Sequence, residues 1–517
     1  MSDVRWEKEK AVPVASAGRY RVVAGQEQRG EPSRSNIGVF PILVVLLILA
    51  LLLPWTMMIP SVLNATLAYL GLFTVAISIS LSVSNGFKPM LGFSSTFLLC
   101  WMFIPAIYQL SHHAAAWNDA QVLDSGANVT SALVLNLFTQ TALLIGYLAS
   151  TRRNMVRYAM PRATIASADP QIEEHTHIRS RLWVAGLFIA VSLALLPYAA
   201  QKLGGFSVFF APRDLRGLNA DQSLDVAANG GITATIVNFF PFTFSVMGAL
   251  LLLQALHMRG WRRFPFLGYV LFIISCVLTW VYANPIANTR FIALAMLGSI
   301  AVAWVWPRTS RWGYVILSAF VALTLLVYPV ASLFNNSRGL SDGNAAVSQG
   351  PFAALATQDF DGFQQTINSF EFVTDHGHTL GHYLISALLV FIPRSIWAWK
   401  ASPASIDVAT NHGYTFTNLS LPTNAELFID FGWLGVIVIF LLVGWIFSHL
   451  DTHWVNVKWL PLIAFLSLTQ VGVIRGPLGS QIPVIIFAVL GLVLCRAMFD
   501  DHRSRSIAAV DISVTSD

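Results

Sequence analysis

Residues 37–59 read IGVFPILVVLLILALLLPWTMMI, a run without a charged side chain. A helix of about 20 apolar residues is long enough to cross the hydrocarbon core of a bilayer. The composition of the whole chain agrees, because 55% of the 517 residues are hydrophobic and only 11% are charged. The sequence therefore predicts an all-α integral membrane protein and argues against a soluble domain.

Similar runs follow along the chain and predict about twelve transmembrane helices. The apolar run LISALLVFIP, at 384–393, is too short to span, so we expect a re-entrant or interfacial helix there. It lies in one large external loop, at 334–426. The spans are expected at 37–59, 61–81, 91–110, 131–150, 182–200, 231–256, 266–283, 289–306, 313–333, 427–448, 458–474 and 480–497.

The expected organisation is one polytopic membrane domain, at 37–497, between cytoplasmic tails at 1–36 and 498–517. The first tail is too polar and too long to begin a cleavable signal peptide, so the first span is expected to stay as an anchor. With this tail inside, 23 of the 31 Lys and Arg residues fall on cytoplasmic segments. This bias follows the positive-inside rule, and the net charge of +5 is explained by topology without a nucleic-acid partner.

The cations left on the outer side are the first candidate site. A guanidinium group is planar and suits paired phosphate oxygens. Several of them just outside the hydrocarbon predict a seat for a lipid-linked diphosphate, with Trp397 between two of the cations as a possible sugar platform. The outer cations are Lys202, Arg213, Arg216, Arg290, Arg338, Arg394, Lys400 and Arg475.

Several of these residues also have a simpler interpretation. Arg290 and Arg475 can reach lipid headgroups from the ends of spans. Arg213 and Arg216 can form a solvated helix face neutralised by Asp214. Trp397 and its neighbour Trp399 fit an interfacial aromatic belt better than a sugar platform, although the two roles are compatible.

Acidic and histidine side chains in the same loop are candidates for proton transfer. They include Asp359, Asp361, His378 and Glu426, and Glu426 stands at the mouth of a span. Lone histidines are more often structural than catalytic. His376, His378 and His382 match no zinc motif, and the three cysteines show no metal-ligand spacing. No metal and no cofactor is expected.

A family resemblance is carried by residues 359–435, which contain DFDGF, GHTLGHYL, FIPRSIWAWKASP and NLSLPTNAELFIDFGWLG. This stretch resembles the O-antigen polymerases, the Wzy-type oligosaccharide repeat-unit polymerases of bacterial inner membranes. NPIANTRF, which enters an upstream span, looks like a second element of the same pattern. The most specific features are Pro393 with Arg394, Lys400, and then Pro422 and Glu426 ahead of a span.

The resemblance implies a reaction on the periplasmic side of the bacterial inner membrane. A growing glycan would pass from its undecaprenyl diphosphate carrier to the non-reducing end of a new lipid-linked repeat unit. Fixed cations would stabilise the departing diphosphate, so a metal is unnecessary. Glu426, His378 and Asp361 are the candidate general bases. Lipid-linked oligosaccharides are the expected partners, with a flippase and a chain-length regulator of the same pathway.

Other functions compete with this interpretation. An O-antigen ligase uses the same donor and differs in its acceptor, although the PRSIWAWK element favours the polymerase. A transferase that uses a polyprenyl monophosphate sugar is disfavoured, because the first external loop is only about residues 59–61. A transporter or flippase fits a count of twelve spans, but the charges crowd at one interface and the two halves of the chain do not match.

Overall fold

The structure is a computed structural model of the chain. All statements below concern the residues that it describes: 39–84, 86–158, 170–203, 205–211, 232–288, 290–306, 310–327, 352–390, 392, 394–414, 417, 419–479, 481–486, 488–490 and 493. The secondary structure of this part is helical, without a strand, apart from a bridge between Ser84 and Gly86. The prediction of an all-α protein is confirmed for these residues.

Eight helices are long and apolar enough to cross a membrane. One of them is continuous from Pro89 to His112, because a π-helical turn joins α3 to α4. The eight are α2 (Val62–Ser84), α3 (Pro89–Leu98) with α4 (Ile104–His112), α5 (Gly126–Tyr158), α6 (Pro170–Leu203), α8 (Ile232–Arg259), α9 (Phe266–Ala283), α17 (Thr423–His453) and α18 (Leu460–Arg475).

Shorter apolar helices lie at the four other predicted spans. They are Leu46–Met57 within α1 (Val39–Met57), Phe291–Trp304 within α10 (Arg290–Trp304), Trp312–Leu326 over α11 (Ser310–Ala322), and Gln481–Leu490. A helix therefore occurs at every predicted position. The number of crossings and their direction stay predictions.

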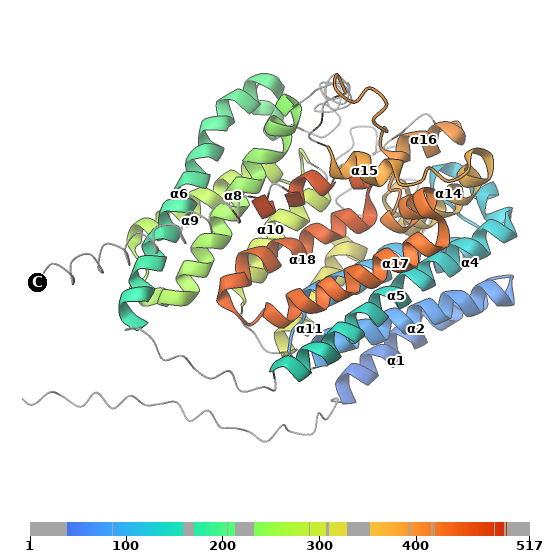
Figure 1. Ribbon diagram of the computed structural model, residues 1–517. Helices are drawn as coiled ribbons and strands as arrows, with labels where there is room; N and C mark the ends of the chain where they lie inside the picture. The colour runs from blue at the N-terminus through green and yellow to red at the C-terminus, as the bar shows by residue number, and fades with distance from the viewer. Residues whose placement is uncertain are drawn as a thin grey trace, which may run out of the picture.

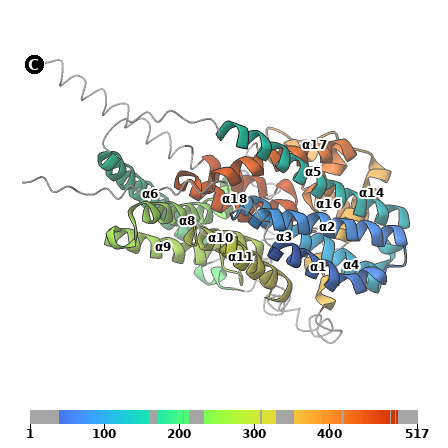
Figure 2. The same cartoon turned by 90° about the horizontal axis from the view of Figure 1, so that it is seen from below.

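The helices pack in two groups joined by a central pair. Figure 1 shows α6, α8 and α9 on one side of the molecule and α1, α2 and α5 on the other. α10 and α18 pack against each other, and α18 contacts both α8 and α3, so this pair bridges the groups, as the view in Figure 2 also shows. The most extensive contact joins α5 to α17. There, a Cβ on Gly146 would overlap the Leu441 carbonyl, and a Cβ on Gly444 would overlap the Leu143 carbonyl.

The predicted external loop is largely helical where it is described. It contains α14 (Gly362–His376), α15 (His382–Leu388) and α16 (Ala404–Asn411), which gather at one end of the bundle in Figure 1. α15 falls on the predicted short helix. Its seven residues rise only about 10 Å, so it cannot cross a bilayer.

The loop ends earlier than the sequence predicts. α17 begins at Thr423, directly after Pro422, so Glu426 lies in the first turn of a helix and not in the loop. A small apolar core joins this turn to the loop helices. It includes Phe372 of α14, Tyr383 of α15 and Val408 of α16, packed with Ala425 and Ile429 of α17. The three loop helices therefore form a cap on the start of α17, and we call them the cap helices.

Candidate functional site

The first two turns of α17 are buried and carry two carboxylates on one face. Glu426 and Asp430 are four residues apart, and both are almost fully buried. Glu426 Oε2 accepts the backbone N–H of Leu478, in the segment after α18, at 2.8 Å. Asp430 accepts from the hydroxyl of Thr379 at 2.5 Å and from the N–H groups of Tyr383 and Leu384. Asp430 therefore anchors the first turn of α15 to α17.

Asp361 is a buried carboxylate with one unpaired oxygen. It stands at the start of α14 and is 1% exposed. Its Oδ2 accepts from Trp117 Nε1 at 3.2 Å and from the backbone of Ser420 at 3.4 Å. Its Oδ1 is buried and has no hydrogen-bond partner among the described residues. Burial raises the pKa of Asp361, and nearby Arg475 and the hydrogen bonds oppose that shift.

Arg475, the last residue of α18, is the cation whose charge lowers the pKa of Asp361. Its guanidinium carbon lies 4.0 Å from the ring centroid of Phe291 and 5.0 Å from that of Trp101. Its Nε is buried without a hydrogen-bond partner in the described part of the chain, and no described carboxylate lies within 4.0 Å of it. A guanidinium with one buried, unpaired nitrogen beside two ring faces favours an anion nearby.

The predicted cations of the cap region bind their own loop. Lys400 Nζ donates to the carbonyls of Val390 and Ile392 at 2.8 and 3.0 Å, and Arg394 donates to Ser402 Oγ at 3.1 Å. Burial, and then the charge of Arg394, lower the pKa of Lys400. These contacts show that both cations hold the segment after α15 in place.

Of the remaining predicted substrate-binding residues, only Trp397 has a described side chain. Trp397 is half-buried, its ring edge-on to Trp399 at 5.0 Å, and its Nε1 has no partner among the described groups. Arg290 begins α10, one residue before the Phe291 ring under Arg475, but its side chain is outside the described part. Arg213, Arg216 and Arg338 also lie outside the described residues.

His378 differs from the carboxylates in its exposure. Its side chain is exposed, and its Nδ1 lies 3.3 Å from the Ile429 carbonyl oxygen. It packs beside Gly432, where α17 is interrupted by a backbone φ of +64°. Of the three predicted bases, Asp361 lies within electrostatic range of Arg475, Glu426 accepts the backbone N–H of Leu478, and His378 is at the surface.

Polar side chains that the sequence analysis did not single out complete this region. They lie on α14, on the segment between α4 and α5, directly after α16 and on α17. The spacing of Asp361, Gln364 and Asn368 along one helix face is a signal that could have revealed them. The group consists of Trp117, Asp119, Gln364, Asn368, Tyr414 and the already named Asp430.

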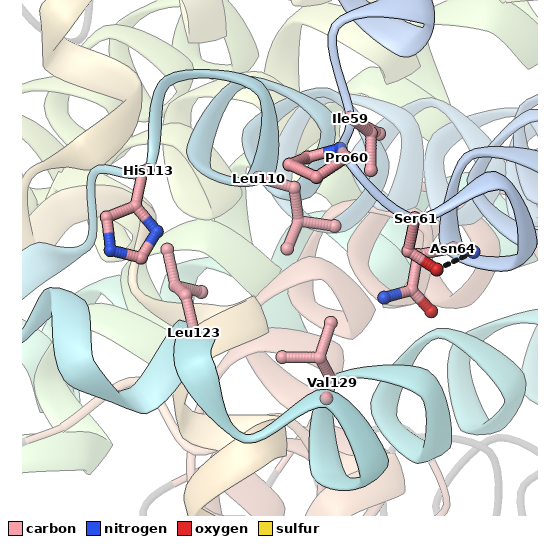
Figure 3. A pocket seen from close by; sticks show the side chains of 9 residues that line it. Ile59, Pro60, Ser61, Asn64, Leu110, His113, Leu123 and Val129 are labelled. Carbon is pink, nitrogen blue, oxygen red and sulfur yellow. Dashed lines mark hydrogen bonds between the residues drawn. The ribbon is translucent and has the colours of Figure 1, made fainter.

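Metal-binding clusters and cavities were the other candidate sites in the described residues. Among the described residues, no three His, Cys, Asp or Glu side chains come together as a possible metal site. A cavity of about 170 Å³ lies between the α1–α2 turn and the facing ends of α4 and α5, as Figure 3 shows. Its lining is mainly apolar, with Ser61, Asn64 and His113, and it contains no predicted site residue.

Comparisons with known proteins add no relative. No protein-family model matches the chain, and neither the curated proteins nor the solved structures include a significant match.

Proposed function

We propose that this protein polymerises undecaprenyl-diphosphate-linked oligosaccharide repeat units on the periplasmic side of a bacterial inner membrane. The product would be an O-antigen, a capsule or an exopolysaccharide. The single observation that supports this most is the pair of Asp361 and Arg475. The two groups lie within electrostatic range of each other, and Asp361 Oδ1 and Arg475 Nε are both buried without a hydrogen-bond partner among the described residues.

The pair has the two functions that this glycosyl transfer needs. The acceptor hydroxyl attacks the anomeric carbon at the reducing end of the growing glycan and gives its proton to Asp361 Oδ1. The bond from that carbon to the diphosphate oxygen breaks, and its electron pair leaves with the lipid diphosphate. In this proposal, Arg475 stabilises the charge that develops on the leaving group.

The position of the pair agrees with a membrane-bound donor. Asp361 is in the predicted external loop, and Arg475 ends a helix long enough to span a bilayer. Of the three candidate bases we prefer Asp361, because Glu426 Oε2 is bound to Leu478 and His378 is exposed. Burial also raises the pKa of Asp361, which brings a carboxylate closer to the range useful for proton transfer.

Deletion of the gene in its host tests the function. Surface glycans and lipid-linked intermediates are analysed by gel electrophoresis and mass spectrometry, with the wild-type gene restored as a control. Single repeat units on lipid, together with loss of long polymer, would support a polymerase. Long polymer retained on undecaprenyl diphosphate would indicate a ligase, and intermediates trapped on the cytoplasmic leaflet would indicate a flippase.

A further inference from the structure

The hydroxyl of Tyr414 is held in a polar nest close to Asp361. It donates to Asp119 Oδ2 at 2.6 Å and accepts amide N–H groups from Gln364 and Asn368 at 3.1 and 3.2 Å. Burial, and then the bond to Asp119, raise the pKa of Tyr414, so the phenol stays neutral. The nest therefore recognises a neutral hydroxyl that donates once and accepts twice, which is the full hydrogen-bonding capacity of a sugar hydroxyl.

The same face of α14 has an excess of unpaired acceptors. Gln364 Oε1, Asn368 Oδ1 and Asp361 Oδ1 are all buried without a hydrogen-bond partner in the described region. Leaving such an oxygen unsatisfied costs about 1–3 kcal/mol. An ionised phosphate only accepts hydrogen bonds, so it cannot satisfy these oxygens. Sugar hydroxyl groups can, because each of them brings a donor.

Two aromatic rings cover this polar face. Trp117 stacks on Tyr414 with ring centroids 6.0 Å apart and an interplanar angle of 19°. Both side chains are half-buried. The backbone of Trp117 has a φ of +62°, in the left-handed region that a bulky residue rarely adopts. Strain of this kind persists where the surroundings fix it, and it clusters at ligand-binding sites. Here the indole N–H is fixed by Asp361.

We propose that Asp119, Gln364, Asn368, Trp117 and Tyr414 form a carbohydrate subsite, which binds one sugar residue of the glycan repeat beside Asp361. This inference rests on the proposed polymerase function and adds the part of the substrate that the α14 face recognises. A hydroxyl of the sugar competes with the Tyr414 hydroxyl for the amides and for Asp119. The remaining hydroxyls pair with the open oxygens of Gln364 and Asn368, and the ring packs on Trp117.

Direct binding tests the subsite without an activity assay. The full-length protein is reconstituted in nanodiscs and titrated against oligosaccharide made by partial acid hydrolysis of the host's surface polysaccharide and labelled with a fluorophore at its reducing end. Fluorescence polarisation gives the dissociation constant. The double variant Gln364→Leu/Asn368→Leu is expected to bind about tenfold more weakly, because it loses several hydrogen bonds at nearly constant volume. Tyr414→Phe is expected to bind at least as tightly as wild type, because it removes the competing hydroxyl.

A matched control is Tyr383→Phe, which removes another hydroxyl of the cap region, one that donates to Asp407 at 2.7 Å. It should leave oligosaccharide binding unchanged. Equal affinity in the double variant and wild type would overturn the subsite, as would loss of binding in Tyr414→Phe. If the double variant fails to elute as folded protein, Asp119→Asn takes its place, with the same tenfold weakening expected and the same unchanged affinity overturning the inference.

The two proposals fail separately. Loss of long polymer on gene deletion, combined with unchanged oligosaccharide binding in the double variant, would leave the polymerase and remove the subsite. Normal polymer on gene deletion, combined with tenfold weaker binding in the double variant, would leave the subsite and remove the polymerase.

Discussion

Asp430 of α17 accepts the backbone N–H of Leu384 at 2.8 Å, across 46 positions of sequence. It also takes the N–H of Tyr383 and the hydroxyl of Thr379, so one carboxylate ties the start of α15 to the bundle. Charge-assisted bonds of this kind are stronger than neutral ones. Asp430 therefore helps to position α15, together with the apolar core that Tyr383 joins.

Replacement of Asp430 by Asn should loosen the cap helices while the protein remains in the membrane. Asn keeps one acceptor oxygen but loses the charge, and we expect destabilisation of about 2 kcal/mol. Hydrogen exchange at the amides of Tyr383 and Leu384 measures this effect and should become faster. Glu371→Gln, a change of an exposed acid on α14, is the matched control and should not alter the exchange. Unchanged protection in Asp430→Asn would show that apolar packing alone places α15.

Replacement of Asp361 by Asn should abolish polymerisation and stabilise the fold. Loss of a general base lowers the rate by about 100-fold or more. Burial raises the pKa of Asp361 in the folded state, so its ionisation disfavours folding at pH values above the ordinary range of an aspartate. The variant should consequently melt at a higher temperature than wild type at neutral pH, with the difference vanishing as the pH falls below that range. A lower melting temperature at neutral pH would mean that the hydrogen bonds of the carboxylate outweigh its burial.

Replacement of Arg475 by Lys should preserve only part of the polymerisation activity. Lysine keeps the positive charge but lacks the planar group that stacks on Phe291 and Trp101. The amount of long polymer, normalised to the amount of protein in the membrane, is the measurement. Arg263→Lys, in the short connection between α8 and α9, serves as the control. Full activity in Arg475→Lys would reduce the role of Arg475 to simple electrostatics, and full activity in Arg475→Ala would remove it from the mechanism.

Replacement of Lys400 by Met should disturb the loop rather than the chemistry. The ammonium group holds the carbonyls of Val390 and Ile392, and Met retains the length of the side chain without the donors. Limited proteolysis should then cleave near these residues more rapidly than in wild type. An unchanged cleavage rate together with complete loss of polymer would restore Lys400 as a direct substrate contact.

Chelators should leave polymerisation by the purified protein unchanged. The proposed transfer uses a carboxylate and a cationic side chain, and its leaving group is stabilised by Arg475. Incubation with EDTA, followed by an assay of chain extension, provides the measurement, with an assay after readdition of Mg²⁺ as its control. Activity lost with EDTA and recovered with Mg²⁺ would require a metal ion in the mechanism.

Hydropathy predicts the apolar helices well, since a span depends on about 20 consecutive residues and on little else. It does not predict the buried polar face of α14. Gln364 and Asn368 look like loop residues in sequence, yet they are fully buried, because Tyr414 supplies them with a polar partner. The surroundings of Arg475 are equally hard to predict from the sequence. Its ring contacts come from Trp101 and Phe291, and no local pattern reveals that these three residues meet.

Glycines divide α17 into two parts with different neighbours. Gly444 of α17 contacts the backbone of α5, and Gly146 of α5 contacts the backbone of α17. The part of α17 around Gly444 therefore packs backbone to backbone against α5. Nearer the N-terminus of α17, the left-handed φ of Gly432 interrupts the helix. The segment beyond this interruption carries Asp430 and, through it, α15. The interruption at Gly432 thus divides α17 into a part that packs closely on α5 and a first part that holds the cap helices.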